Sequence, residues 1–497
     1  MKKLQRYAIA IALLLVTCLF VESTYVPGIE AVYAATAKTT LKTTKATIKI
    51  GATAKIEINN KKTKAVYTFK SSDIKVATVN KSATVTGKKA GAAVITVSET
   101  YNKKTTVLGK VQITVQPNLD MEKMIKNSLV STGNNFRMKK AIEKAMNGEE
   151  VTIAYIGGSI TEGYNSPANT DFAYLSYQYF KDTFGKDDGS NVKFVNAGMA
   201  GTPSSLGMVR YERDVQERSE SAPDIIFIEF AVNDNDDTTN GDAYESLVRN
   251  ALNEENQPAV VLLFSVFKSK WNLQSRMQPV GEHYNLPMIS IKDAVVPELE
   301  SGALTNAEFF SDEWHPTQAG HKIMADCINY YFDTVNSETK AEDITIPEEA
   351  QIGKSYEGIQ MLDSSSKLEG VSIRAGGFSE KDAVLGTFRY ASTIKTFPDN
   401  WKHSATSSKT GFKMTLDCKN LVIVYKLSSN KNSGKIDVYV DGVKTKTYDS
   451  YQSGGWNNPW TQVVFSNTES AEHKIEIKMA SDSTSKDFTV LAFGYTK

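Results

Sequence analysis

The feature that most constrains this chain is the alternation of short apolar runs with amphipathic segments between residues 119 and 338. The apolar runs are rich in β-branched residues and lack a polar face, which is typical of parallel strands covered on both sides. They occupy residues 151–156, 192–196, 224–230, 259–267 and 287–291. Apolar residues recur at helical spacing over residues 136–146, 172–184, 242–253, 273–284 and 317–335. This alternation predicts an α/β domain over residues 119–338, built on a five-stranded parallel sheet.

The N-terminal residues have the pattern of a secretory signal. Three basic residues among the first six precede an apolar run over residues 8–21, and Val32-Tyr33-Ala34 places small residues where a signal peptidase cuts. We therefore predict a signal peptide over residues 1–34 and a secreted, extracellular protein, with cell-surface association as a further expectation. A retained membrane anchor is the alternative, although the run is short for a bilayer span. No other stretch is long enough to span a bilayer, so no membrane contact is predicted after cleavage.

Length and composition limit the remaining possibilities. A chain of 497 residues is expected to form two to four domains. Its formal net charge of zero gives no field that favours nucleic acid, so no nucleic-acid partner is predicted. The mature chain keeps Cys327 and Cys418, which fall in different predicted domains. No disulfide framework is therefore predicted.

Residues 37–116 are rich in lysine and threonine, and their apolar positions alternate with polar ones. Half-buried strands are predicted at residues 54–58, 66–69, 83–86, 93–97 and 111–115, which together indicate a small β-sandwich. The order of Lys70-Ser71-Ser72-Asp73, Val76-Ala77-Thr78-Val79 and Ala90-Gly91-Ala92-Ala93 resembles the group 2 bacterial immunoglobulin-like domain. This resemblance implies a spacer or adhesive module at the cell surface, in contact with the cell wall or a glycan.

The C-terminal third is again dominated by strands. Residues 339–357 are polar and acidic and are predicted to be a linker. Beyond it, strands are clearest at residues 421–425, 435–440 and 473–477, and Asp441-Gly442 is typical of a hairpin turn. Residues 358–497 are predicted to form a second β-sandwich, jelly-roll-like in type.

Polar residues and glycines follow several of the predicted strands. Ser159 stands behind two glycines at the end of the first strand, Gly201 follows the second, and Asn233 follows the third. The carboxyl ends of parallel strands meet at one edge of a doubly wound sheet, which is where such folds bind ligands. Ser159 is therefore a candidate nucleophile. Gly201 and Asn233 are candidate hydrogen-bond donors to an oxyanion.

Asp312 and His315 precede the last predicted helix. A tight turn brings side chains three residues apart together, so Asp312 can bind the Nδ1 of His315 and leave Nε2 for a serine. Nucleophile, base, orienting carboxylate and oxyanion donors are the parts that acyl transfer requires. A serine that merely caps a helix is the alternative for Ser159.

The four segments also resemble, in order, the motifs of the SGNH (GDSL-like) hydrolases. They are Gly-Gly-Ser-Ile-Thr at Ser159, Asn-Ala-Gly-Met-Ala-Gly at Gly201, Ala-Val-Asn-Asp at Asn233, and Asp-x-x-His-Pro at Asp312 and His315. The resemblance implies a flavodoxin-like three-layer α/β/α fold and a Ser-His-Asp triad. It also implies an oxyanion hole made by Ser159, Gly201 and Asn233. Gly-Gly-Ser replaces the commoner Gly-Asp-Ser, a variant that looks like the carbohydrate-esterase branch.

Other residues near these motifs have weaker signals. Trp314 is a candidate substrate contact, with packing on the last helix as the alternative. The loop containing Asp234, Asp236 and Asp237 is interpreted as solvated, and a cation site there is the alternative. Histidines at metal-ligand spacing are absent from the sequence, so neither a metal nor a cofactor is predicted.

The sequence therefore predicts a secreted serine esterase, a carboxylic ester hydrolase that works through an acyl-enzyme. Its expected substrate is an acylated carbohydrate, such as acetylated xylan or mannan, or another ester. Two alternatives stay open. One is a lipase-like acylhydrolase, and the other is a surface adhesin or carbohydrate-binding protein whose hydrolase domain is inactive.

Overall fold

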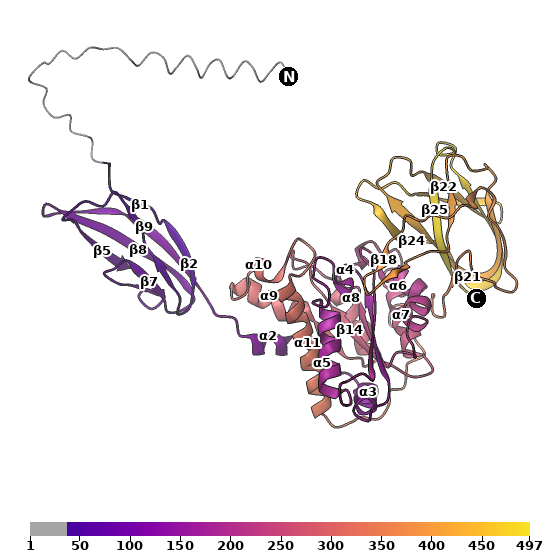
Figure 1. Ribbon diagram of the computed structural model, residues 1–497, viewed down its shortest axis with the longest axis horizontal. Coiled ribbons are helices and arrows are strands. Elements are labelled where there is room, and N and C mark those ends of the chain that lie inside the picture. Colours follow the sequence, from indigo (N-terminus) through magenta and orange to yellow (C-terminus); the bar gives the residue numbers. More distant parts are fainter. Residues whose placement is uncertain (1–36) are drawn as a thin grey trace, which may run out of the picture. The chain divides into compact units, whose positions relative to one another are not determined.

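The computed structural model describes residues 37–497 (Figure 1). The predicted signal peptide lies outside the described residues. The chain divides into two compact units, one ending at Val115 and one spanning Gln116–Lys497, and each is described by itself. Within residues 37–497, every helix is too short or too polar to cross a bilayer.

The first unit consists of antiparallel strands around one apolar core. One sheet has the order β2-β9-β8-β5, another has β3-β7-β6, and β1 pairs with β4. The bounds are β1 Thr40–Leu41, β2 Lys45–Lys49, β3 Thr53–Lys55, β4 Ile58–Asn59, β5 Val66–Ser71, β6 Ala77–Val79, β7 Thr84–Gly87, β8 Gly91–Tyr101 and β9 Lys104–Gln116. Every second side chain of β8 is buried, as the sequence alternation predicted. The likeness to an immunoglobulin-like domain stays a prediction.

The α/β part of the second unit contains a six-stranded sheet in the order β10-β15-β14-β13-β11-β12. Its bounds are β10 Leu129–Ser131, β11 Val151–Gly157, β12 Val192–Gly198, β13 Ile225–Glu229, β14 Ala259–Phe264 and β15 Met288–Ser290. The five predicted strands are parallel, and numbering them along the chain gives the order 2-1-3-4-5 of flavodoxin-like folds. The α/β prediction is confirmed.

The sheet has one strand more than predicted. Strand β10 pairs antiparallel with β15 and ends the sheet at that edge. Only three residues long and half-buried throughout, it lacks the apolar run that marks the other five strands. An edge strand packs on one neighbour only, so its sequence needs less apolar character.

Helices cover both faces of this sheet (Figure 1). Their bounds are α2 Met121–Asn127, α3 Phe136–Met146, α4 Ser159–Glu162, α5 Phe172–Phe184, α6 Ser204–Tyr211, the π-helix η1 Glu212–Gln216, the 3-10 helix η2 Asp234–Asp236, α7 Asp242–Leu252, α8 Gln274–His283, α9 Ile291–Ser301, α10 Asn306–Phe309 and α11 Gln318–Ser337. Ile153 and Tyr155 of β11 pack with α3, α5 and α11. Ala154 and Ile156 pack on the other face with α6, α7 and α8. Because successive side chains of β11 point to opposite faces, the sheet lies between two layers of helices.

The C-terminal part is one eight-stranded sheet with the path β16-β25-β21-β24-β22-β23, to which β17 and β20 add. The bounds are β16 Gln360–Leu362, β17 Ser372–Arg374, the 3-10 helix η3 Gly376–Phe378, β18 Thr387–Phe388, β19 Ala391–Lys395, β20 Trp401–His403, β21 Phe412–Ser428, β22 Lys435–Val440, β23 Val443–Asp449, β24 Trp456–Met479 and β25 Phe488–Thr496. Strand β18 pairs with β19 in a separate hairpin. The region is rich in strands, as predicted, whereas the jelly-roll-like sandwich stays a prediction. Cys327 and Cys418 are buried and free.

The long strand β21 connects the two parts of this unit. A register shift between Cys418 and Asn420 changes which side chains face the C-terminal core. Beyond the shift, Leu421 and Ile423 face that core, whereas Val422 and Val424 join the apolar cluster of α6 and α7. The C-terminal sheet and the α/β part therefore share buried apolar surface.

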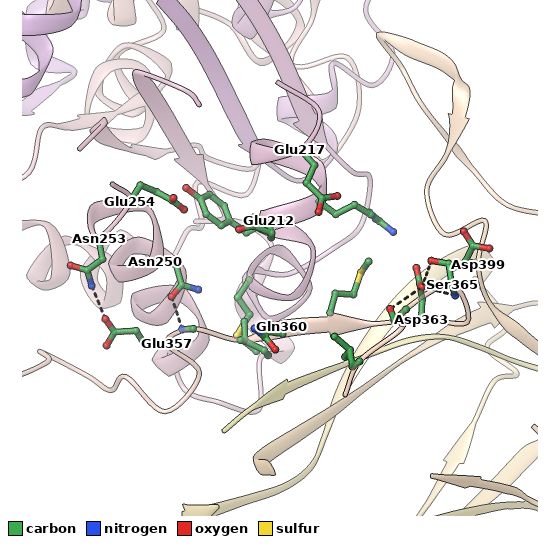
Figure 2. A pocket seen from close by; sticks show the side chains of 18 of the residues that line it. Glu212, Glu217, Asn250, Asn253, Glu254, Glu357, Gln360, Asp363, Ser365 and Asp399 are labelled. Atoms are coloured by element: carbon green, nitrogen blue, oxygen red, sulfur yellow. Dashed lines mark hydrogen bonds between the residues drawn. The ribbon is translucent and has the colours of Figure 1, made fainter. Parts of the chain in front are cut away.

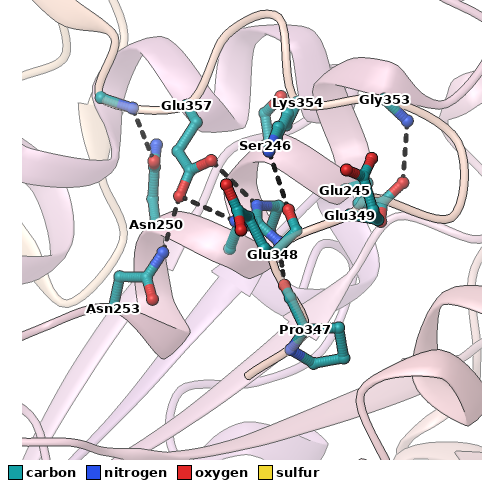
Figure 3. Close-up of polar contacts among 12 residues, drawn as sticks. Glu245, Ser246, Asn250, Asn253, Pro347, Glu348, Glu349, Gly353, Lys354 and Glu357 are labelled. Atoms are coloured by element: carbon teal, nitrogen blue, oxygen red, sulfur yellow. Dashed lines mark hydrogen bonds and ion pairs between the residues drawn. The ribbon is translucent and has the colours of Figure 1, made fainter. Parts of the chain in front are cut away.

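The predicted linker is an ordered strap of coil bound along α7 (Figure 3). Buried Glu245 accepts the backbone N–H groups of Gln351 and Gly353 at 2.6 and 2.9 Å. Arg249 donates to the Pro347 carbonyl at 2.9 Å and forms an ion pair of 2.9 Å with Glu357. Residues 339–357 are named the strap below.

Candidate active site

The turn after β11 is tight because it contains two glycines. Gly157 ends the strand and Gly158 is the N-cap of α4, so Ser159 occupies the first position of that short helix. A Cβ on Gly157 would overlap the Thr161 hydroxyl, and one on Gly158 would lie 2.6 Å from Asn233 Nδ2. Neither position has room for a side chain. The nucleophile turn, residues 157–161, therefore packs directly against the end of β13.

Three of the predicted side chains form one hydrogen-bonded chain. Ser159 Oγ lies 3.0 Å from His315 Nε2, and His315 Nδ1 lies 2.8 Å from Asp312 Oδ2. These side chains come from segments far apart in the sequence. Ser159 follows β11, and His315 and Asp312 lie between α10 and α11. A serine hydroxyl, an imidazole and a carboxylate in this order can move a proton from the hydroxyl to the imidazole.

Asp312 is held in its charged form by several donors. Its Oδ1 accepts the backbone N–H groups of Trp314 at 2.7 Å and His315 at 2.8 Å, and Oδ2 accepts the Asn165 amide at 3.0 Å. Partial burial acts to raise the pKa of Asp312, but the hydrogen bonds from His315 and the two backbone groups lower it below its ordinary value. Asp312 is therefore a carboxylate at neutral pH, able to orient the imidazole.

The two other predicted oxyanion donors lie in the loops that follow β13 and β12, the two strands that flank β11. Asn233 follows β13, and its amide lies against Gly158. Gly201 follows β12 and has a φ of 65°, a left-handed conformation that favours glycine. The C-terminal ends of β11, β12 and β13 adjoin, so the three loops converge where the strand order reverses.

Two acidic residues in the loop after Asn233 are buried, whereas the sequence predicted a solvated loop. Asp234 is 1% exposed, and its carboxylate accepts the Ser204 N–H at 2.7 Å and hydroxyl at 2.6 Å. Asp237 is also buried and accepts the Gly241 N–H at 2.9 Å. Because Ser204 begins α6 directly after the Gly201 loop, Asp234 ties the loop of Asn233 to the loop of Gly201. Three acidic residues close together are typical of a solvated loop, so the sequence did not predict this structural role.

Two residues near the histidine also have defined environments. Trp314 is 55% exposed on the loop between α10 and α11, with its ring centroid 6.4 Å from that of His315. His321 is buried, and its Nδ1 accepts the Phe172 N–H at 3.3 Å. Burial lowers the pKa of His321 to about 3. His321 is therefore a neutral packing residue rather than a second base.

The C-terminal part reaches the site with residues that carried no recognised motif. A Cβ on Gly201 would lie 2.6 Å from two ring carbons of Trp456, the first residue of β24, so the indole covers this glycine. Trp456 is nevertheless 60% exposed and borders a hollow of about 370 Å³ in the C-terminal sheet. Between β18 and β19, Arg389 and Tyr390 contact the segment that follows α4. Sequence reasoning missed Arg389 and Tyr390, because nothing local marks a contact with residues 219–227 positions earlier.

A larger cavity of about 860 Å³ lies elsewhere, between the π-helix η1 and the start of the C-terminal sheet (Figure 2). None of the predicted site residues lines it. Carboxylates face it from both sides, among them Glu212 and Glu254 from the α/β part and Asp363 and Asp399 from the C-terminal part. Burial and the neighbouring Glu212 raise the pKa of Glu254. The chemistry predicted from the sequence therefore belongs to the Ser159 site and not to this cavity.

Comparisons with known proteins agree with the motifs. Residues 155–323 match the GDSL-like Lipase/Acylhydrolase family, so this segment is an SGNH-type hydrolase domain. The structure is similar to that of a two-domain esterase (CEX) active on acetylated mannans, solved alone and co-crystallized with mannopentaose. Both are 28% identical to this chain with a TM-score of 0.64, covering 75% of this chain and 98–99% of theirs. No curated protein sequence matches. The chain is a carboxylic ester hydrolase, which confirms the enzyme class predicted.

Proposed function

We propose that this chain, whose residues 155–323 form a GDSL-like hydrolase domain, is a secreted serine esterase that deacetylates polysaccharide. The observation that carries the proposal is the chain of hydrogen bonds from Ser159 through His315 to Asp312, at 3.0 and 2.8 Å. Such a chain is the machinery of acyl transfer. Secretion is proposed from the N-terminal signal pattern.

The first half of the reaction acylates the serine. His315 Nε2 takes the Ser159 hydroxyl proton as the Oγ attacks the acetyl carbonyl carbon. The negative charge on the carbonyl oxygen is stabilised by the N–H groups of Ser159 and Gly201 and by the Asn233 amide. The imidazolium, stabilised by Asp312, then protonates the departing sugar oxygen, and the ester bond breaks.

The second half hydrolyses the acetyl-enzyme. A water molecule enters where the sugar alcohol left, and His315 Nε2 removes one of its protons. The resulting hydroxide attacks the acetyl carbon, a second oxyanion forms in the same place, and acetate leaves as Ser159 regains its proton. The residues that act in acylation therefore act again in deacylation.

The proposed substrate class is supported by the similar esterase and by the residues around the mouth of the site. That esterase acts on acetylated mannans. In this chain, exposed Trp314 lies beside His315, and exposed Trp456 covers Gly201. Exposed indoles can stack on the apolar faces of sugar rings. An acylated sugar within a polymer is the ester that this arrangement fits best.

Acetate release from acetylated mannan and acetylated xylan, compared between the wild-type protein and Ser159→Ala, tests the proposal. We expect release by the wild-type protein and essentially none by the variant. Equal release by both would remove the claim. A preference for long-chain over acetyl nitrophenyl esters would favour the lipase-like alternative. A fluorophosphonate probe that leaves Ser159 unlabelled, together with glycan binding, would favour the adhesin.

A further inference from the structure

A small hairpin of the C-terminal part extends toward the nucleophile turn. Its strands are β18 and β19, and Arg389 and Tyr390 form the turn between them. Phe388 anchors the hairpin: it is buried in the cluster of α6 and α7, and the Arg218 guanidinium lies 3.9 Å from its ring centre. Tyr390 donates to Asp171, the N-cap of α5. The turn is therefore fixed on both sides.

Arg389 occupies the centre of this contact. Its Nη1 donates to the carbonyl oxygens of Gly163 and, at 3.4 Å, Glu162, which end α4. Its Nη2 donates to the carbonyl oxygens of Ser166 and Pro167, both at 2.7 Å. One guanidinium thus collects four backbone acceptors from residues 162–167, which are named the triad-facing loop below. A cation at the C-terminal end of a helix is also favoured by the helix dipole.

The triad-facing loop contacts both the histidine and the aspartate. The Tyr164 ring lies 4.6 Å from the His315 ring, centroid to centroid. Asn165 donates its amide to Asp312 Oδ2 at 3.0 Å, from a left-handed backbone with a φ of 63°. A non-glycine residue in that conformation needs neighbouring contacts to hold it. Arg389 provides such contacts on either side of Asn165.

We propose that Arg389 is a positioning residue for the triad, which acts through the triad-facing loop to orient His315 and Asp312. The inference rests on the proposed function, because it concerns the same reaction. The hydrogen bonds of Arg389 go to backbone oxygens of residues 162–167, and the guanidinium takes no part in proton transfer. The C-terminal part thereby completes the catalytic apparatus of the α/β part.

The chemistry of arginine explains why this residue type suits the position. A guanidinium presents five N–H groups in a fixed planar fork and can bind several carbonyl oxygens at once. A lysine ammonium is a compact point charge on a flexible stem, so Arg389→Lys keeps the charge but loses the simultaneous contacts. The substitution Arg389→Lys should therefore not restore the function.

Steady-state hydrolysis of 4-nitrophenyl acetate by the full chain tests the proposal, because a small ester makes little use of glycan contacts. Misplacement of catalytic groups by about 1 Å can cost 10²-fold, so we expect Arg389→Ala to lower kcat about 10- to 100-fold with KM nearly unchanged. Arg374→Ala, which removes an exposed arginine of β17, is the matched control and should keep the wild-type kcat. An unchanged kcat in Arg389→Ala would overturn the proposal.

A double-mutant cycle with Asn165→Ala distinguishes positioning from general stabilisation. If Arg389 acts through the triad-facing loop, both substitutions disturb the same positioning of His315 and Asp312. The kcat of the double variant should then be little lower than that of the slower single variant. Fully multiplicative losses would show that Arg389 does not act through Asn165 and would contradict the proposal.

If Arg389→Ala does not fold, Arg389→Lys carries the test. We expect it to retain the Tm of the wild-type protein within a few degrees and still to lose kcat. Full activity of Arg389→Lys would overturn the inference. A wild-type protein that hydrolyses no ester would instead refute the proposed function, so the two failures are distinguishable.

Discussion

At the scale of single residues, the site combines groups whose charges are controlled by burial. Glu229, at the end of β13, is 1% exposed beneath the nucleophile turn and accepts the Thr161 hydroxyl at 3.0 Å. Burial raises its pKa to about 7, although hydrogen bonds from Thr161 and neighbouring groups oppose the shift. Asp312, by contrast, keeps a lowered pKa because donors surround it. One carboxyl therefore supports the turn while the other orients the imidazole.

Removal of one oxyanion donor should slow the reaction without unfolding the protein. We expect Asn233→Ala to lower kcat for acetyl esters by about 10²–10³, the usual loss for one such donor. The exposed, neighbouring Thr238→Ala is the control and should keep full activity. An Asn233→Ala variant with wild-type kcat would show that the amide does not contact the oxyanion.

The buried Glu229 should make stability depend on pH. Its folded-state pKa of about 7 exceeds the ordinary value of 4.5, so between these pH values the folded state holds a proton that the unfolded state has released. The contribution of Glu229 to the free energy of unfolding is therefore complete below about pH 4.5 and is lost as the pH rises toward 7. One pKa unit corresponds to ~1.4 kcal/mol, so the loss amounts to ~3 kcal/mol.

Urea unfolding of wild-type protein and Glu229→Gln across this range measures the effect. Glutamine cannot ionise, so we expect the variant to lose less stability than the wild-type protein as pH rises from 4.5 to 7. The exposed Glu220→Gln should follow the wild-type curve. A stability difference between Glu229→Gln and wild-type protein that is constant with pH would contradict the assigned pKa.

At the scale of elements, segments without regular structure hold the parts of the second unit together. The strap runs along α7, where its backbone N–H groups find acceptors on side chains that face away from the sheet (Figure 3). Glu245 additionally accepts the Tyr284 hydroxyl at 2.6 Å, which links α7 to the end of α8. A coil segment packs stably only where its backbone groups have such partners.

Loss of the Glu245 carboxylate should release the strap. Glu245→Ala removes the carboxylate that accepts the backbone N–H groups of Gln351 and Gly353. A hydrogen bond to a charged group contributes ~1.5–3 kcal/mol, so we expect a clear decrease in the urea midpoint of the second unit. Faster proteolysis within residues 339–357 should accompany it. The exposed Glu255→Gln serves as the control. An unchanged midpoint and an uncleaved strap would show that these hydrogen bonds contribute little.

At the scale of the whole molecule, the two units differ in how their apolar cores are built. The core of the first unit is formed by residues 41–115. The C-terminal sheet, by contrast, shares its apolar cluster with α6 and α7 through Val422, Val424 and Leu491. One unit is therefore energetically self-contained, whereas the two parts of the other depend on each other.

Truncation should reveal this difference. We expect a chain of residues 116–497 to keep the wild-type kcat/KM for acetyl esters. A chain that lacks residues 358–497 should be inactive and aggregate, because buried apolar surface becomes exposed. Both are measured by esterase assay and size-exclusion chromatography. An active, monomeric protein without residues 358–497 would contradict the shared core.

Zero net charge conceals a strong division of charge between the units. Residues 37–116 contain sixteen lysines, no arginine and three carboxylates, and fifteen of the lysines are exposed. Residues 117–497 contain 38 basic and 52 acidic residues. We expect the full chain to bind a sulfonate cation exchanger at low salt and to elute as salt screens the lysines. Removal of residues 37–115 should abolish retention on the exchanger. Retention of residues 116–497 alone would show that the lysines of the first unit are not its cause.

The sequence by itself determined the local elements and the chemistry-bearing residues. Helices α3 and α5 have the predicted bounds, because their apolar spacing is local and Asp171 caps the second. The positions of Ser159, Gly201 and Asn233 followed from strand ends, which parallel topology brings to one edge, and His315 was found before the last predicted helix. These features depend on residues that are near one another in the chain, so a pattern can reveal them.

Only the tertiary structure decided which distant segments support the site. Arg389 meets the loop after α4, Trp456 covers Gly201, and Asp234 is buried against Ser204. No local pattern shows these contacts, because each exists only once the chain has folded. Long-range packing also ordered the strap and added β10 to the sheet. Local periodicity records which face of an element is buried, whereas the identity of its partner is settled by three-dimensional packing.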